Sequence, residues 1–419
     1  MTTSISVDDA CPRCAEPVVS ARGAAPWCPS CEWNLDLFEP RRRPPEFGWK
    51  WADRLTHRVA YRLTERQFAA LAGSPIARRS ATLPRIALMA VALVLLAVLL
   101  GCTALGAWLV LHDFPGLALV PGVLLLLIAV AARPRLGKLA DDVTVLDRGR
   151  APALFDLVDR VAAAVGTRAP DVIGVDPAFN AYTTMVGLRR RRVLCLGLPL
   201  FVTLRPQERV ALVGHEMGHF VNGDVRRGPL TGVAISTLGL LSYLTSPGGS
   251  AVRHTGIVAM LTTSVQWVLS RLLRGVHLLL VWIGQRDGQR AEYLADELSA
   301  RAAGTPAAVG FLGMFVVSDS IDTVIRREAR ANGGGDAWRA AADVARANLA
   351  DAMPRLGQLT RRDEVSLFAS HPPDGLRTSM LEQGPAYPPA VVLTESQSAA
   401  IDDELAALVE RVRRDMARA

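Results

Sequence analysis

The chain has 419 residues, of which half are hydrophobic and few are aromatic, with a formal net charge of +7 and a mean hydropathy of +0.23. So much aliphatic content indicates membrane-spanning helices, and the basic balance fits either nucleic-acid binding or the cytoplasmic loops of a membrane protein. The six cysteines lack the spread of a secreted disulfide scaffold, and no signal peptide precedes the first long apolar run, which begins near Ile86.

Two Cys-Pro-x-Cys pairs dominate residues 1–35. Cys11 and Cys14 form the first pair, and Cys28 and Cys31 form the second. Two such pairs complete a tetrahedral four-thiolate site, so we expect a closed structural zinc ribbon around one Zn2+. Redox-active dithiols are the alternative. The ribbon is expected to bind a protein partner, a substrate or the catalytic domain.

Residues 36–85 combine a basic linker with an amphipathic helix. The linker contains Pro40-Arg-Arg-Arg-Pro-Pro45, and the helix is expected from about Trp49 to Leu71. Its expected apolar side comprises Trp49, Trp51, Leu55, Val59 and Leu63. The arginine run is typical of nucleic-acid binding too, but its position before a membrane span favours a lipid surface.

Residues 86–132 are predicted to form a transmembrane hairpin. Residues 86–111 carry no charge and, at about 1.5 Å per residue, are long enough to cross a ~30 Å hydrocarbon core. A second apolar run extends to Ala132 after a short break. Lys and Arg flank the hairpin on both sides but are missing from its turn, so both flanks are expected in the cytoplasm.

Residues 133–228 are predicted to form the first part of a catalytic domain. The pattern indicates a helix over 151–165, a strand over 172–176, and a β-hairpin of strands 180–187 and 193–198. An edge strand of this hairpin would pair with an extended peptide substrate. A purely structural hairpin is the alternative.

The sequence His215-Glu-Met-Gly-His219 follows within a predicted helix from Pro206 to Val221. Residues four apart lie on one face of a helix, so His215 and His219 can bind the same metal ion. Glu216 is then close enough to take a proton from a water molecule on a catalytic zinc. The alternative is a pair of surface histidines that flank a glutamate.

Residues 229–284 are predicted to form a second pair of membrane helices, over 229–245 and 257–284. Arg271, Arg274 and His277 recur every three residues and are expected to share one side, facing a bundle interior or a water-filled cavity. The alternative is a helix that packs on the soluble domain. An even number of crossings would return the chain to the cytoplasm.

Residues 285–390 are predicted to complete the catalytic domain. Glu292, on a predicted helix over 287–303, is the expected third zinc ligand, and Asp296 lies one turn later to accept the free ring N–H of a zinc-bound histidine. Residues 327–336, with three glycines, are expected to be a mobile loop. His371 precedes two prolines, so its backbone is extended and its ring can project into a cleft. Residues 391–419 are expected to be a helix or tail without chemistry.

Four motifs now stand in order: Asn180-Ala-Tyr182, His215-Glu-x-x-His219, Glu292-x-x-x-Asp296 and Ser370-His-Pro-x-x-x-x-Arg377. With two apolar runs before the zinc helix and two after it, the chain resembles the HtpX family of integral-membrane zinc metalloproteases, relatives of the zinc-dependent CAAX prenyl proteases. The resemblance covers roughly residues 85 to 385.

The resemblance implies a role for each matching residue. His215, His219 and Glu292 would bind the catalytic Zn2+, with Glu216 as general base. Asn180 would position the peptide and His371 would stabilise the oxyanion. Around them, Asp296 would support a ligand, Arg377 would brace the Glu-bearing helix, and Asp224 would be structural. Residues 1–85 are an addition to the family pattern, and the Pro-Pro-Asp-Gly after His371 departs from it.

These expectations combine into one hypothesis. The fold is mainly α, with membrane-embedded helices and a cytoplasmic α+β metalloprotease domain whose small β-hairpin lies next to the zinc helix. The protein would be a multi-pass zinc endopeptidase of the cytoplasmic membrane, with ribbon and catalytic domain in the cytoplasm, that cuts misfolded membrane proteins and binds no nucleic acid.

Three alternatives remain open. The first is a processing protease for one membrane-anchored substrate, such as a prenylated or signalling protein. The second is a membrane-tethered scaffold or sensor with a degenerate zinc cleft. The third is a membrane-anchored nucleic-acid binder, which predicts salt-dependent binding by residues 1–85.

Overall fold

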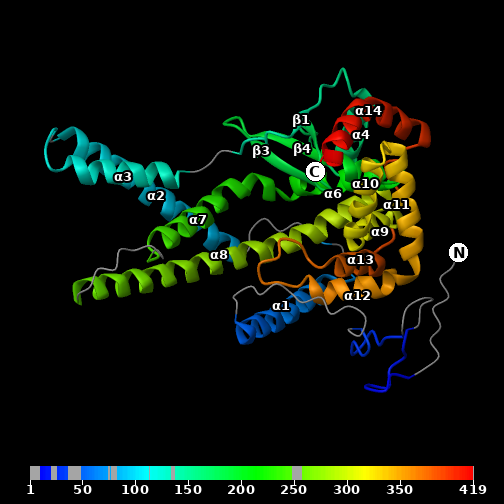
Figure 1. The fold of residues 1–419 in the computed structure, drawn as a ribbon, viewed down its shortest axis with the longest axis horizontal. Helices are drawn as coiled ribbons and strands as arrows, with labels where there is room; N and C mark the ends of the chain where they lie inside the picture. Colours follow the sequence, from blue (N-terminus) through cyan, green and yellow to red (C-terminus); the bar gives the residue numbers. More distant parts are fainter. Residues whose placement is uncertain are drawn as a thin grey trace. The chain divides into compact units, whose positions relative to one another are not determined.

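The computed structural model describes residues 10–19, 26–35, 49–73, 76, 83–112, 114–133, 137–247 and 257–418. The basic run at 41–43 therefore lies outside the described residues. Figure 1 shows a mostly helical chain with one small sheet, which confirms the predicted fold class. The chain divides into two compact units. We call residues 1–78, 139–222 and 289–419 the sheet unit, and residues 79–138 and 223–288 the apolar unit.

The sheet of the sheet unit has four strands in the order β1-β2-β4-β3. These are β1 (Thr144–Val145), β2 (Val172–Asp176), β3 (Ala181–Val186) and β4 (Arg191–Gly197). Strand β2 runs parallel to β4, and β3 pairs antiparallel with β4 as the predicted hairpin. Gly187 begins the hairpin turn at φ +68°, a conformation that suits glycine. Because β3 is the last strand in the order, its outer edge has no partner strand among the described residues.

Besides this sheet, the described residues of the sheet unit form helices. They are α1 (Lys50–Leu71), α4 (Pro152–Ala164), α5 (Leu198–Thr203), α6 (Pro206–Asn222), the last part of α8 (Ile257–Ala303), α9 (Thr305–Val316), α10 (Ser318–Arg330), α11 (Gly335–Leu349), the single 3-10 turn η1 (Ala350–Ala352), α12 (Met353–Asp363), α13 (Asp374–Gln383) and α14 (Glu395–Arg418). The predicted helices at 151–165 and 206–221 are confirmed. The predicted loop over 327–336 is shorter than expected, because α10 continues to Arg330 and α11 begins at Gly335, which leaves only residues 331–334 between the helices.

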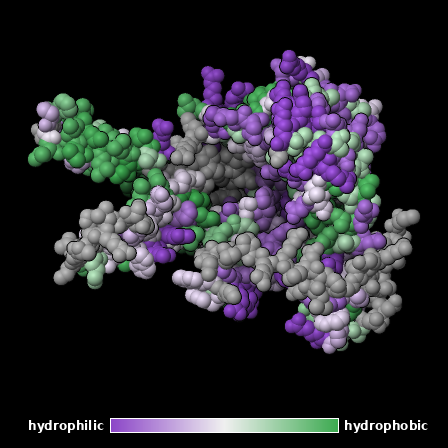
Figure 2. Space-filling view, viewed as in Figure 1, coloured by the Kyte–Doolittle hydropathy of each residue, from purple (hydrophilic) through white to green (hydrophobic). Residues whose placement is uncertain are grey.

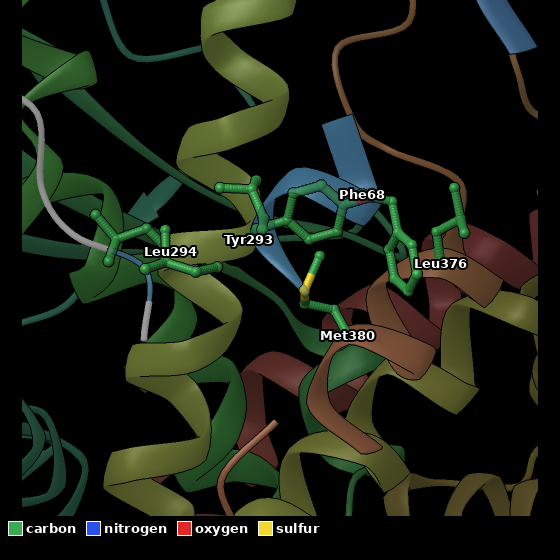
Figure 3. Packing of buried hydrophobic residues seen from close by; sticks show 7 residues of the cluster. Phe68, Tyr293, Leu294, Leu376 and Met380 are labelled. Carbon is green, nitrogen blue, oxygen red and sulfur yellow. The ribbon is translucent and has the colours of Figure 1, made fainter. Parts of the chain in front are cut away.

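Helix α1 belongs to the core of the sheet unit. Its residues Phe68 and Leu71 are buried against Tyr293 of α8 and Leu376 and Met380 of α13 (Figure 3). Burying a Phe or Leu side chain is worth about 1.5–3 kcal/mol, so this cluster fixes three helices that are distant in sequence. The predicted helix from Trp49 to Leu71 is therefore present, but the side that packs on α8 and α13 is not the expected apolar side, because Trp51, Leu55 and Val59 are exposed.

The apolar unit consists of α2 (Leu83–His112), α3 (Leu119–Ala132), α7 (Asp224–Leu244) and the first part of α8. Among the described residues, two helices are long and apolar enough to cross a membrane, over Ile86–His112 and Met260–Ala303. Figure 2 shows the hydrophobic side chains that cover α2 and α3. Helix α3 and the apolar part of α7, Ile235–Leu244, are shorter apolar helices. Their crossing of the membrane stays a prediction.

Two findings differ from the predicted second membrane pair. Helix α8 runs without a break from Ile257 to Ala303, so the predicted separate helices at 257–284 and 287–303 are one element. Within it, His277 Nδ1 lies 2.9 Å from the Ile235 carbonyl oxygen of α7. Arg271 and Arg274 are instead exposed, so the three side chains do not share one interior-facing side.

Candidate active site

The two histidines of the H-E-x-x-H motif lie on α6 beside α8. Pro206 starts α6 at a first-turn position, where a missing backbone N–H costs nothing. Gly214 and Gly218 face α8 so closely that a Cβ on Gly218 would lie 2.8 Å from the Ala295 Cα, and one on Gly214 would lie 3.1 Å from the Ser299 Cα. The Ser299 hydroxyl also donates to the Ala211 carbonyl, at 2.7 Å. This close approach brings Glu292 to the histidine pair.

Three residues bring potential metal-ligand atoms together between α6 and α8. His215 Nε2 lies 3.3 Å from His219 Nε2 and 3.5 Å from Glu292 Oε2, and His219 Nε2 lies 3.6 Å from Glu292 Oε1. A tetrahedral zinc with ligand bonds of about 2.0–2.1 Å would hold neighbouring donors about 3.3 Å apart. The residues present therefore fit zinc, and the set leaves a fourth position open, as catalytic zinc sites do.

Asp296 and Arg377 support the first histidine. His215 Nδ1 lies 3.0 Å from Asp296 Oδ1, and Arg377 binds both carboxylate oxygens of Asp296, at 2.8 and 2.9 Å. Burial alone would lower the pKa of His215, but hydrogen bonds to Asp296 and Glu292 outweigh it and raise the pKa. The carboxylates of Asp296 and Glu292 thus stabilise a positive charge next to them. A proton on His215 supplies that charge, and a metal cation bound at the same place would supply it too. The contact with Asp296 orients the ring so that Nε2 faces His219 and Glu292, where it could bind a metal ion.

Glu216 and His371 complete the polar groups around these donors. Glu216 is 4 % exposed, and its Oε2 has no hydrogen-bond partner in the part of the chain that the structure describes. A buried carboxylate oxygen without a partner is costly, which fits a site built to hold a further group, such as a water molecule. His371 Nδ1 lies 2.9 Å from Glu292 Oε2, while more than half of its side chain is exposed. The Pro-Pro-Asp-Gly sequence does not displace Arg377 from Asp296.

Two further residues from the sequence analysis are less closely tied to this site. Asn180 directly precedes β3, with an exposed side chain and a backbone carbonyl that accepts a hydrogen bond from Gly197 N at 2.8 Å. A Cβ on Gly197 would lie 2.3 Å from that carbonyl oxygen, so glycine is required there. Asp224 is the first residue of α7, and its side chain lies outside the described residues.

The four cysteines of the N-terminal segment form a second group of metal-binding type. Cys11 Sγ lies 3.5 Å from Cys31 Sγ, and Cys14 Sγ lies 3.5 Å from Cys28 Sγ. All four sulfurs lie within 4.8 Å of one another. Tetrahedral zinc with Zn–S bonds of about 2.3 Å would separate the sulfurs by about 3.8 Å. These distances fit a structural zinc and are too long for disulfide bonds.

The cysteine segment docks on α12 of the sheet unit. Trp27 and Leu35 are fully buried in a cluster with Leu359 of α12. Trp27 Nε1 donates to Gln358 Oε1 at 2.8 Å, and the Arg355 guanidinium donates to the Leu35 carbonyl at 2.8 Å. The sequence left a protein partner, a substrate or the catalytic domain as the surface that the ribbon binds. The structure shows it bound to α12 of the same chain.

Sequence reasoning missed the helix that supports α6 from behind. Arg209 of α6 is fully buried, and its guanidinium donates to Asp402 Oδ1 at 2.7 Å and to Ser398 Oγ at 2.9 Å, both on α14. Arg339 of α11 binds the other oxygen of Asp402, at 2.7 Å. The C-terminal segment therefore has a structural role. The available signal was an arginine beside the apolar run from Val210 to Val213.

Comparison with known proteins agrees with this geometry. Residues 149–384, more than half of the chain, match the profile of peptidase family M48. The matched segment contains His215, Glu216, His219, Glu292 and His371. It excludes the cysteine segment and α1, which lie before it. No significant match to a solved structure is found.

Curated relatives carry the same family relationship. Protease HtpX homolog 1 of Sulfurisphaera tokodaii is 28% identical over 152 residues, 35% of this chain and 49% of the relative. Protease HtpX of Pseudomonas putida strain GB-1 is 27% identical over 177 residues, 40% of this chain and 57% of the relative. The chain thus spans about half the length of the curated relatives that it matches. Together with the family match, these similarities confirm the resemblance predicted from motif order, and the chain belongs to peptidase family M48.

Proposed function

We propose that this protein is a membrane-bound zinc metalloendopeptidase. The observation that carries the proposal is the convergence of His215, His219 and Glu292 at separations of 3.3–3.6 Å, beside the buried carboxylate of Glu216. Zinc bound there would lower the pKa of a water molecule toward about 7 and polarise the substrate carbonyl. Glu216 then takes a proton from the attacking water and returns it to the leaving amine nitrogen, a contribution of about 10²- to 10⁴-fold.

His371 and β3 would handle the substrate. The half-exposed ring of His371, held at Glu292 by a 2.9 Å contact, is positioned to donate a hydrogen bond to the oxygen that becomes negative when the carbonyl is attacked. The open edge of β3 supports binding of an extended polypeptide by β-strand addition, and β3 packs against α6, which carries Glu216. Asn180, at the start of this strand, would position the peptide.

The candidate membrane helices support substrates that are themselves membrane proteins. We propose cleavage on the cytoplasmic side of the cytoplasmic membrane, in quality control of misfolded membrane proteins. The basic flanks of the predicted hairpin over residues 86–132 support this side by the positive-inside rule. The curated relatives named Protease HtpX agree with proteolysis as the activity.

The test compares wild type with Glu216→Gln in native membranes, using an unstable model membrane protein as substrate, with and without a zinc chelator. Cleavage that needs both Glu216 and the metal supports the proposal. Equal cleavage by both forms contradicts it. Cleavage of a single defined membrane-anchored substrate, with the unstable protein left intact, would keep the mechanism and replace quality control by specific processing.

A further inference from the structure

Helix α1 has a buried face and an opposite exposed face. Ala60, Thr64, Phe68 and Leu71 are buried in the sheet unit. On the other side Trp51, Leu55 and Val59 are 64%, 52% and 41% exposed. Trp49 precedes the helix and stacks on Trp51, with ring centroids 6.1 Å apart. An apolar strip that begins with two tryptophans is thus exposed in the described structure.

A row of arginines shares this exposed face. Arg54, Arg58, Arg62 and Arg66 follow one another at four-residue spacing, and all four are exposed. At about 100° per residue, they and the three apolar residues fall within a sector of roughly 140°. Glu65 falls within the same sector, between Arg54 and Arg58, and its carboxylate pairs with Arg361 of α12, at 3.4 Å. The face therefore combines basic and apolar side chains with one carboxylate, that of Glu65, which is paired with Arg361 of α12.

We propose that this face, comprising Trp51, Leu55, Val59 and the four arginines, binds in the interface of an anionic lipid bilayer. Tryptophan is favoured at the boundary between headgroups and acyl chains, where its ring is apolar and its N–H is polar. Arginines extend their apolar stems along such a surface and place their charges at the phosphates.

A short linker joins this face to a helix that is able to cross a membrane. Residues 72–85 separate α1 from Ile86, where the first helix able to cross a membrane begins, and fully extended they would reach about 50 Å. Phe68 of α1 packs on Tyr293, the neighbour of Glu292. Lipid contact through α1 would therefore orient the zinc-ligand residues relative to the bilayer surface. The proposal does not depend on peptidase activity.

The experiment places a photoreactive diazirine amino acid at Leu55 of the full chain, reconstituted in nanodiscs of phosphatidylcholine and phosphatidylglycerol. The matched control is Val344 on α11, which is 61% exposed in the same unit. We expect at least about fivefold more lipid adduct at position 55 than at position 344, since each basic residue adds appreciably to binding at an anionic surface. The adduct should fall toward the control level in nanodiscs of phosphatidylcholine alone, and in the Arg58→Gln, Arg62→Gln, Arg66→Gln triple variant.

Three results would overturn the proposal. They are equal lipid adducts at both positions, an adduct at position 55 insensitive to lipid charge and to the triple substitution, or predominant cross-linking to another protein or to nucleic acid. The comparison between the two lipid compositions uses the chain with all four arginines. It therefore tests the proposal even if the triple variant fails to fold. Loss of peptidase activity plays no part in the readout, so failure here is distinguishable from failure of the proposed function.

Discussion

Gly218, between the two catalytic-motif residues Glu216 and His219, touches Ala295 of α8 at a distance that only glycine permits. A Cβ at position 218 would lie 2.8 Å from the Ala295 Cα and 3.0 Å from its Cβ. Ala295 is one residue before Asp296 and three after Glu292. The separation of α6 and α8 at this point therefore sets the distance between the histidines and the third donor.

Replacing Gly218 with alanine should push α6 away from α8. The close atoms belong to the backbone and Cβ of Ala295, which cannot move aside as the end of a flexible side chain would. His215, His219 and Glu292 should therefore no longer be close enough to bind one metal ion. We expect loss of the active-site zinc and of cleavage, while the four-cysteine zinc is retained. Metal analysis should then give about half the wild-type zinc per chain. Gly357→Ala is the control, since nothing lies within 4 Å of its added Cβ. Full zinc content in Gly218→Ala would refute this packing argument.

Asp296→Asn should weaken zinc binding without removing a ligand. The substitution takes a charge from the carboxylate that orients His215 and leaves Arg377 buried without its bidentate partner. Partners of this kind typically contribute about 10- to 100-fold to metal affinity or activity. Competition with a chelator of known affinity measures the change. Arg377→Lys keeps the charge but loses the fork geometry, and it should give a smaller loss of the same kind. Unchanged zinc affinity in Asp296→Asn would mean that this carboxylate has no such role.

Trp27→Ala should release the cysteine segment from α12. The substitution removes a fully buried indole and its hydrogen bond to Gln358, a loss of about 3–5 kcal/mol for buried Trp-to-Ala changes. Hydrogen exchange in α12 should rise. Trp49→Ala is a matched control because Trp49 is 61% exposed. Equal exchange in the two variants would show that the docked arrangement contributes nothing to α12.

Asp402→Asn should destabilise the sheet unit. Asp402 is the shared partner of Arg209 and Arg339, and loss of its charge leaves the fully buried Arg209 uncompensated. Breaking a buried ion pair costs about 3 kcal/mol or more, so thermal unfolding should shift down by several degrees. The exposed neighbour Asp403 provides the control, Asp403→Asn, which should unfold at the wild-type temperature. If Asp402→Asn unfolds at the wild-type temperature, α14 does not stabilise α6 through this ion pair.

The local motifs were predictable because their physics is local. A four-residue spacing on a helix pairs His215 with His219, and Gly187 with its neighbouring arginines indicates the β3–β4 turn. Glu292 was assigned from motif order and resemblance, and the structure brings it to the pair. The break expected between the predicted helices over 257–284 and 287–303 does not occur, because a glycine in a helix costs only about 1 kcal/mol and α8 continues through Gly284 and Gly288.

The missed features depend on contacts between segments far apart in the sequence. Docking of Trp27 on α12 joins residues more than 300 positions apart, and the Arg209–Asp402 pair joins residues 193 apart. Neither leaves a periodic signal in the sequence.

The most direct test measures zinc content and cleavage on the same purified preparations of wild type, Glu216→Gln and Glu292→Gln. We predict two zinc ions per chain and cleavage for wild type, two zinc ions and no cleavage for Glu216→Gln, and one zinc ion and no cleavage for Glu292→Gln. Cleavage at the wild-type rate by Glu216→Gln, or full zinc content and activity in Glu292→Gln, would contradict a metallopeptidase site assembled from α6 and α8.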